Sequence, residues 1–288
     1  MLVGPMVRRR RLGSELRRLR EARALKLDDV ASRLGVAPST LSRIETGKAP
    51  TKTSYLTVML ELYQVDDPAL RQPLLEMARE GQRKGWWADV DELLPAGFGR
   101  YLGLESEASD LRAFTVQTIH GLLRTESYAT AVIAAERSDL TAAERERLVS
   151  VQMRRREVLL GTDPIQLQVI LDESSLLRSL GSPEIMAGQL EHLLAAARRP
   201  TVTVQVLRLA GDPLPVLSGP FAILSFAESG DPDLASTKGI RGQALIAERG
   251  ADVRALSDVF DALSQAALGP ADSADLIGDL AGNPASTS

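Results

Sequence analysis

The sequence predicts a multi-domain chain, in which an all-α N-terminal domain is followed by a mixed α+β C-terminal domain. The chain has 288 residues, so two domains are the first expectation. Over roughly the first 80 residues the apolar side chains recur with helical spacing, whereas strand-like runs alternate with helical stretches further on. The charge changes at the same boundary. Residues 1–84 hold 17 Lys and Arg against 10 Asp and Glu, which gives a net charge of +7. Because the whole chain carries −4, the remaining residues carry −11.

The expected N-terminal domain spans residues 12–84 and follows a basic arm at residues 1–11. A first helix is expected over about residues 10–23, where leucines recur at i, i+4 and i+7 and the other faces are rich in Arg. Apolar spacing of the same kind predicts two later helices, around residues 56–63 and 70–77.

Two short helices are expected between these elements. The first covers residues 27–34 and ends at Gly35, because glycine readily takes the left-handed conformation that follows a helix. Pro38 suits the first turn of the second helix, whose inward residues are Leu41 and Ile44. The connection between them is three residues long.

Two short helices joined in this way predict a helix-turn-helix, in which the second helix enters the major groove of DNA and the first braces it. The residues left on the outward face of the second helix are Pro38, Ser39, Thr40, Ser42 and Arg43. Arg43 is the best reader of a base edge, because its guanidinium can donate two hydrogen bonds to guanine. Lys48 and Lys52 suit phosphates. The arm at residues 8–11 either enters a minor groove or touches phosphates, or is a disordered solubilising tail.

Residues 16–48, LRRLREARALKLDDVASRLGVAPSTLSRIETGK, resemble the helix-turn-helix of phage Cro and repressor proteins, the XRE type. The resemblance covers about 60 residues and implies a five-helix DNA-binding domain. It implies DNA contacts from Ser39, Arg43, Thr46 and Lys48. It also implies a structural ion pair between Arg20 and Glu45, although by spacing alone Glu45 can equally be a solvated carboxylate. A double-stranded DNA operator is the expected partner.

Three positions depart from that family's pattern. Lys26 and Ala37 stand where the family usually places a helix-capping Ser or Thr, each substitution costing about 1 kcal/mol. Leu27 replaces a frequent polar DNA contact. We therefore expect specificity to depend more heavily on Arg43.

In the C-terminal domain, expected over residues 85–280, strand-like runs cover residues 111–119, 165–171, 201–209 and 220–226. A capping box at Thr141 predicts a helix through Leu160, and further helices are expected over residues 183–198 and 252–268. Residues 281–288 read as a disordered tail, since Gly, Ala, Ser and Pro dominate the end of the chain.

Composition narrows the classes of function. The chain has no Cys and two His, which excludes disulfides and thiolate metal sites and disfavours a zinc cluster. We find neither a phosphate-binding loop nor a metal set, and we expect no enzyme and no cofactor. Asp172 and Glu173, at a strand end, fit either acid/base or metal chemistry, or a helix start that favours acidic residues. No apolar run of membrane-spanning length and no signal peptide are evident, so we expect a cytoplasmic protein without a membrane partner.

From Trp86 to about Ile277 the chain resembles the C-terminal domain of actinobacterial regulators of the WhiJ type, often described as antitoxin-like. The stretches that carry this are GFGRYLGLESEASDLRAFTVQTIHGLLRTESYA (97–129), LDESSLLRSLGSPEIMAGQLEHLL (171–194) and GPFAILSF (219–226). Arg124 departs from the glutamine usual there. The resemblance implies a sensor or interaction domain, commonly matched to a small acidic partner protein.

Aromatic residues gather at the start of this domain and can line a ligand pocket or partner groove, or simply pack in the core. The candidates are Trp86, Trp87, Tyr101 and Tyr128.

Two functional hypotheses follow. The first is a homodimeric transcriptional regulator that reads two half-sites about one helical turn apart and is controlled through its C-terminal domain by a small protein partner or a small-molecule ligand. The alternative is an antitoxin-like interaction protein that sequesters a small partner and binds DNA for autoregulation.

Overall fold

The computed structural model describes residues 4–210, 219–227, 231–239 and 242–282. It divides into two compact units, Met1–Ala88 and Asp89–Ser288. Most of the expected C-terminal tail, residues 283–288, lies outside the described residues, whereas residues 281 and 282 close the last helix.

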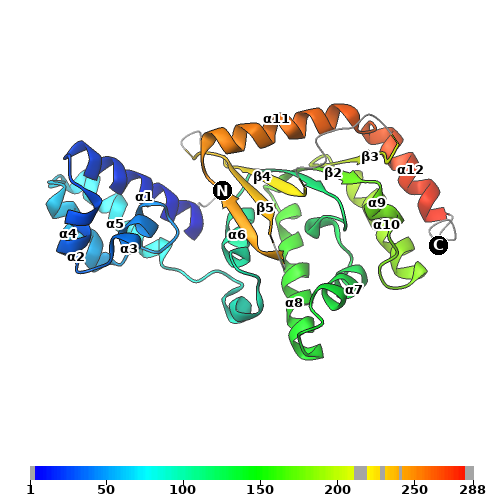
Figure 1. The fold of residues 1–288 in the computed structure, drawn as a ribbon, viewed down its shortest axis with the longest axis horizontal. Helices are drawn as coiled ribbons and strands as arrows, with labels where there is room; N and C mark the ends of the chain where they lie inside the picture. Colours follow the sequence, from blue (N-terminus) through cyan, green and yellow to red (C-terminus); the bar gives the residue numbers. More distant parts are fainter. Residues whose placement is uncertain (1–3, 211–218, 228–230, 240–241, 283–288) are drawn as a thin grey trace. The chain divides into compact units, whose positions relative to one another are not determined.

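The first unit is all α in its described residues (Figure 1). Its helices are α1 (Pro5–Ala22), α2 (Leu27–Leu34), α3 (Pro38–Glu45), α4 (Thr53–Leu62) and α5 (Pro68–Gly81). The helix α1 begins earlier than expected, so residues 5–11 form its first turns instead of an arm apart from the domain. Proline is well placed at the start of a helix, and Val7 is buried there with 3% of its surface exposed.

One apolar core joins these helices. Leu16, Leu41, Leu56 and Leu60 are fully buried within it. The backbones of α1 and α3 approach closely at Gly13, where a Cβ atom would lie 2.5 Å from the carbonyl oxygen of Ile44. Glycine at this position therefore allows α3 to rest directly on α1.

The second unit is a six-stranded mixed sheet with helices on both sides. Its strands are β1 (Asp110–Thr115), β2 (Gln166–Asp172), β3 (Val202–Leu207), β4 (Phe221–Ser225), β5 (Leu234–Lys238) and β6 (Ala244–Ala247). Its helices are η1 (Ala88–Leu93), α6 (Phe98–Glu105), η2 (Gly121–Leu123), α7 (Glu126–Glu136), α8 (Ala142–Arg155), η3 (Arg156–Leu159), α9 (Ser174–Leu177), α10 (Pro183–Ala197), α11 (Gly250–Ala266) and α12 (Pro270–Gly282). These elements agree with the mixed α+β class that the sequence predicts.

The strand order is β3-β2-β1-β4-β5-β6. The strands β3, β2 and β1 are parallel, whereas β4, β5 and β6 continue the sheet in antiparallel pairs. The strand β1 is therefore the place where the sheet changes from parallel to antiparallel pairing.

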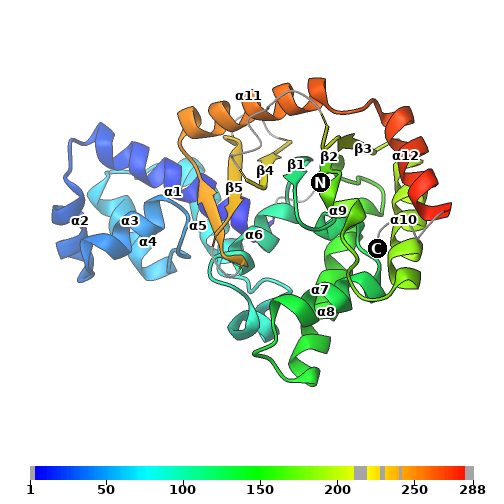
Figure 2. The ribbon, with the colours of Figure 1, turned by 45° about the vertical axis from the view of Figure 1, so that its right-hand side comes forward.

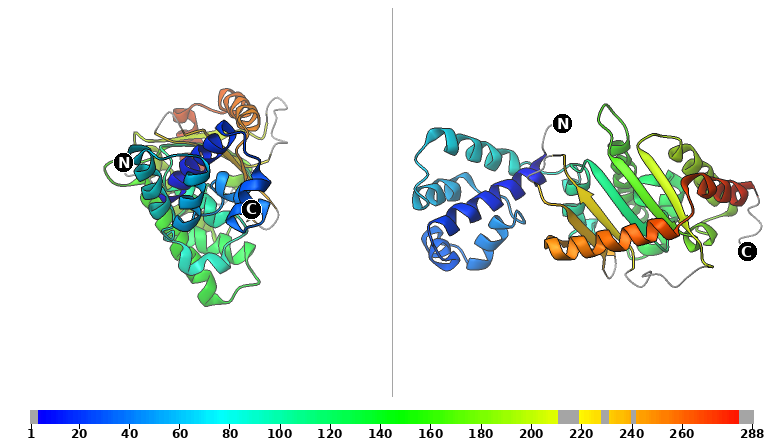
Figure 3. Two further views of the ribbon diagram at one scale, coloured as in Figure 1. Left: turned by 90° about the vertical axis from the view of Figure 1, so that its left-hand side faces the viewer. Right: turned by 90° about the horizontal axis from the view of Figure 1, so that it is seen from above.

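The helix α11 lies across one face of this sheet, as Figure 3 shows from above, and α7, α8 and α10 lie on the other side (Figure 1). Phe114 of β1, Phe221 of β4 and Phe260 of α11 meet in the core beneath α11. The helix α12 packs on α10 beside β3 (Figure 2). No helix in the described ranges is long and apolar enough to cross a membrane.

Candidate functional site

The turn between α2 and α3 sets the position of the outward face of α3. Gly35 has a φ of +65°, in the left-handed region, and ends α2. The N–H of Val36 donates to the Ala31 carbonyl at 3.0 Å, which closes the end of the helix. Lys26 and Ala37, the residues before α2 and α3, make no side-chain cap hydrogen bond.

The outward face of α3 carries short polar and basic side chains. Ser39, Ser42 and Arg43 are exposed and Thr40 is half-buried. Beyond the helix, Lys48 and Lys52 are exposed, and the Lys52 ammonium lies 5.4 Å from the centroid of the Tyr55 ring. Thr46 is half-buried, and its hydroxyl donates to the Ser42 carbonyl at 2.8 Å.

A buried ion pair fixes α3 to α1. Arg20 Nε donates to Glu45 Oε1 at 2.7 Å, and Arg20 Nη2 donates to Glu45 Oε2 at 2.9 Å. The third guanidinium nitrogen donates to the Leu25 carbonyl at 2.9 Å. Since the two side chains are only 10% and 3% exposed, this bidentate pair holds the last turn of α3 in one orientation. The structure thus brings together the two residues that the resemblance pairs.

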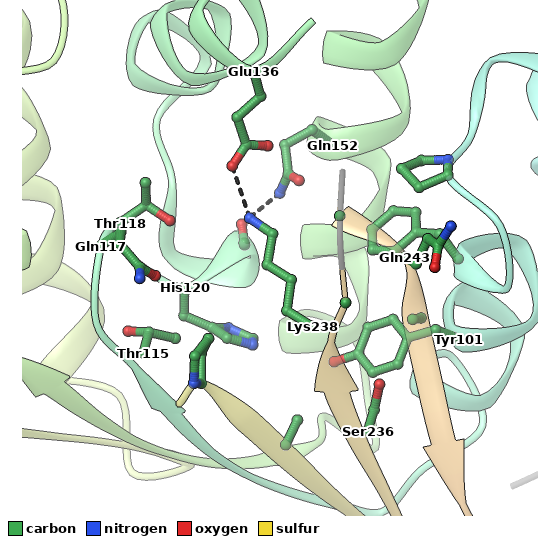
Figure 4. Close-up of a pocket in the computed structure, with 18 of the residues that line it drawn as sticks. Tyr101, Thr115, Gln117, Thr118, His120, Glu136, Gln152, Ser236, Lys238 and Gln243 are labelled. Carbon is green, nitrogen blue, oxygen red and sulfur yellow. Dashed lines mark hydrogen bonds and ion pairs between the residues drawn. The ribbon is translucent and has the colours of Figure 1, made fainter. Parts of the chain in front are cut away.

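A cavity of about 630 Å³ lies in the second unit, next to the carboxyl ends of β1 and β5 (Figure 4). Ligands of open α/β sheets commonly bind outside the carboxyl ends of strands, where the order of the sheet changes. Side chains of α6, α7 and α8 complete the walls, so the cavity draws on elements distant in sequence.

Four cationic residues line this cavity in the described part of the chain, and three of them have a carboxylate partner. Buried Arg155 forms a bidentate pair with Glu105, with both N···O distances 2.8 Å. At the mouth, Lys238 and Glu136 pair at 2.7 Å, each just under half exposed (Figure 4). The third pair joins Arg137 to Asp139, at 3.0 Å. The fourth cation, Arg124, donates instead to neutral oxygens.

His120 lies on the cavity wall (Figure 4) and is 7% exposed. Its Nδ1 accepts the Leu122 N–H at 3.4 Å, which assigns the proton of the neutral ring to Nε2. Burial, reinforced by the charges of Arg155 and Arg124, lowers the pKa of His120 to about 3. The ring is therefore a neutral hydrogen-bond donor at pH 7.

Of the aromatic candidates, Tyr101 alone appears among the described residues that line this cavity. Tyr128 is fully buried, and its hydroxyl accepts the Ile119 N–H at 3.3 Å, so it packs in the core. Trp86 and Trp87 form an edge-to-face pair with ring centroids 5.6 Å apart.

Sequence reasoning missed most of the cavity. Thr115, His120, Arg124, Ser236 and Lys238 all contribute to its wall, but they come from two stretches of the chain more than 100 residues apart, 115–124 and 236–238. The one local signal was Arg124, which stood out as a departure from the family pattern.

The short exposed helix, its glycine turn and its buried support define a helix-turn-helix DNA-binding regulator. A family model described as a helix-turn-helix domain matches residues 11–74. A second model, described as a domain of unknown function (DUF5753), matches residues 98–279. Because this match covers more than half of the chain, the protein belongs to that family. Comparisons with curated proteins and with solved structures found no match.

Proposed function

We propose that the protein is a homodimeric, sequence-specific transcriptional regulator whose second domain controls when its helix-turn-helix binds an operator. The observation that carries this proposal is the outward face of α3. It presents donors to solvent on a helix that the Arg20–Glu45 pair holds in place. A rigidly supported, donor-rich helix is what major-groove reading requires.

Within this proposal the side chains divide between bases and phosphates. Ser39 and Arg43 read base edges, with Thr40 and Ser42 beside them, while Thr46, Lys48 and Lys52 contact phosphates. Thr46 needs a rearrangement for this role. Its hydroxyl hydrogen already points to the Ser42 carbonyl, so it must turn toward a phosphate to donate.

Homodimerisation follows from the small reading surface. The helix α3 has only eight residues, or about two turns, and reaches only a few base pairs. Two copies on half-sites about one helical turn apart recognise a longer operator. The second domain supplies the dimer contacts and the control in this scheme, through a ligand or a small protein partner.

The charge of the second domain favours a ligand over an acidic partner. Residues 85–288 carry a net charge of −11, so a small acidic protein would meet a surface of like charge. The antitoxin-like alternative predicts a stoichiometric complex with such a protein, and co-purification from the native host tests it.

The decisive test is the variant Arg43→Ala. An operator is first selected from a random DNA pool with the wild-type chain, and gel-shift titrations then compare that operator with a scrambled duplex. We expect Arg43→Ala to lose about 1–3 kcal/mol of discrimination, roughly 5- to 150-fold, with an unchanged circular dichroism spectrum.

Arg79→Ala serves as the matched control. Arg79 is exposed and lies on α5, outside the reading helix α3. Its replacement by Ala removes the same charge. It should weaken both duplexes alike and leave discrimination intact. Full discrimination in Arg43→Ala would contradict the assignment of α3 as the reading helix.

A further inference from the structure

Arg124 gives the cavity of the second unit a positive charge that is not held in an ion pair with any described residue. Its Nε donates to the Ile119 carbonyl at 2.8 Å, and Nη2 donates to Thr118 Oγ1 at 2.9 Å. Both acceptors are neutral, so they fix the guanidinium plane without compensating its charge. Among the described residues Arg124 forms no ion pair, and its Nη1 has no hydrogen-bond partner.

Burial of part of the surface of Arg124 makes this charge costly. It lowers the pKa of Arg124 to about 10, and the neighbouring Arg155 adds repulsion. A desolvated cation of this kind is stabilised by a bound anion. The site also lies in a domain whose net charge is −11, so its positive sign is a local feature.

Neutral donors surround the same space. His120 offers its Nε2 hydrogen, and Ser236 of β5 lines the same cavity (Figure 4). The hydroxyl oxygen of Thr115 is buried and has no hydrogen-bond partner among the residues that the structure describes. The one carboxylate among the described lining residues, Glu136, is held by Lys238 at the exposed mouth.

An apolar wall faces these donors. Phe98 and Tyr101 of α6 stack with ring centroids 5.8 Å apart, and the Arg155 guanidinium lies 5.2 Å from the Phe98 centroid. Because Glu105 satisfies Arg155 in a buried pair, this cation serves to fix the wall. The cavity volume of about 630 Å³ suits a drug-sized molecule.

We propose that this cavity binds a small organic anion, specifically a carboxylate with an apolar or aromatic body. Arg124 and His120 hold the carboxylate, and the wall of Phe98 and Tyr101 contacts the body. Binding of the anion does not depend on DNA binding. An effect of the bound anion on operator affinity rests on the proposed function.

Isothermal titration of the full chain tests the binding. The probes are benzoate, 1-naphthoate and octanoate, each paired with its neutral amide, which keeps the shape and removes the charge. We expect at least one of these anions to bind ten-fold or more tightly than its amide. If no anion in the panel is preferred over its amide, the inference is wrong.

Two variants locate the site. Arg124→Gln should bind the preferred anion no better than the amide. The matched control Arg254→Gln removes an exposed arginine from α11, on the opposite face of the sheet, and should bind like the wild type. Equal loss in both variants, or retained preference in a folded Arg124→Gln, would place the anion elsewhere. If Arg124→Gln does not fold, Arg124→Lys replaces it. In that variant the preference for the anion over its amide should be weaker than in the wild type.

The same samples separate this inference from the proposed function. Gel shifts on the selected operator are repeated with the preferred anion at saturation, and we expect operator affinity to change at least three-fold. Anion binding without that change retains the site and overturns its control of DNA. Intact operator binding without any anion preference overturns the site alone.

Discussion

The pair of Arg20 and Glu45 shows how a single buried contact positions a recognition helix. Its side chains are 10% and 3% exposed, so Arg20→Met leaves a buried carboxylate without its partner. We expect the free energy of unfolding of the first unit to fall by about 3–5 kcal/mol. Urea denaturation followed by circular dichroism measures this change.

Arg17→Met on the same helix is the control. Arg17 pairs with Glu21 at 2.8 Å, but both side chains are more than half exposed, and such a pair contributes about 1 kcal/mol or less. Similar losses in the two variants would mean that burial of the Arg20 pair does not determine its contribution.

His120 should make the stability of the second unit depend on pH. Because its pKa is about 3 in the folded chain and about 6.5 when unfolded, the unfolded state binds the proton more tightly. Stability is therefore unaffected well above pH 6.5 and falls as the pH drops from there toward 3. Between pH 7 and pH 5 this contribution amounts to about 2 kcal/mol.

The variant His120→Asn isolates that contribution, since its side-chain oxygen can accept the Leu122 N–H and does not titrate. Chemical denaturation at both pH values should show the wild type losing about 2 kcal/mol more than the variant. Carboxylates and His192 titrate in both proteins and cancel in the comparison. Equal losses would show that His120 is protonated in the folded state.

At the scale of elements, two glycines in helices should respond to alanine with opposite signs. In α1, a Cβ at Gly13 would lie 2.5 Å and 2.7 Å from the backbone oxygens of Ile44 and Glu45. Neither oxygen can swing away, so we expect Gly13→Ala to cost about 1–3 kcal/mol and to weaken operator binding by displacing α3.

Gly188 of α10 is exposed, and nothing lies within 4 Å of a Cβ built there. Gly188→Ala should therefore stabilise the chain by about 0.5–1 kcal/mol through helix propensity. Thermal unfolding of both variants checks the pair. Stabilisation by Gly13→Ala would show that α1 and α3 have room to separate.

Local signals explain which elements the sequence could predict. The helices α2 and α3 were expected at their observed positions because Gly35 suits the end of α2 and Pro38 suits the first turn of α3. The early start of α1 was missed because residues 8–11 are all arginine and give no apolar spacing. The strands β5 and β6 were missed because they are short, LASTK and ALIA, and form through long-range pairing with β4 and with each other.

The two candidate sites differ in predictability for the same reason. The outward face of α3 lies within one helix, so its side chains follow from spacing alone. The cavity combines β1 and its following loop with α7, α8 and β5, and no periodic pattern within one segment links them. Its chemistry became visible only when the sheet brought those segments together.

At the scale of the whole molecule, each unit has an apolar core of its own. Among the described residues, the core around Leu16 and Leu41 draws on residues 12–78, and the one around Phe260 draws on residues 114–267. We therefore expect residues 1–88 to fold when expressed alone, with a cooperative thermal transition in circular dichroism.

The same fragment tests where dimerisation resides. If the second domain joins two copies, the full chain binds a two-half-site operator 10²- to 10⁴-fold more tightly than a single half-site, because the second contact becomes intramolecular. The fragment should lack this preference and bind both duplexes with similar affinity. In sedimentation it should behave as a monomer. Gel shifts with the two duplexes give the ratio directly. A fragment that keeps the full preference would assign the dimer contacts to the helix-turn-helix unit, and the second domain would then act only as the sensor.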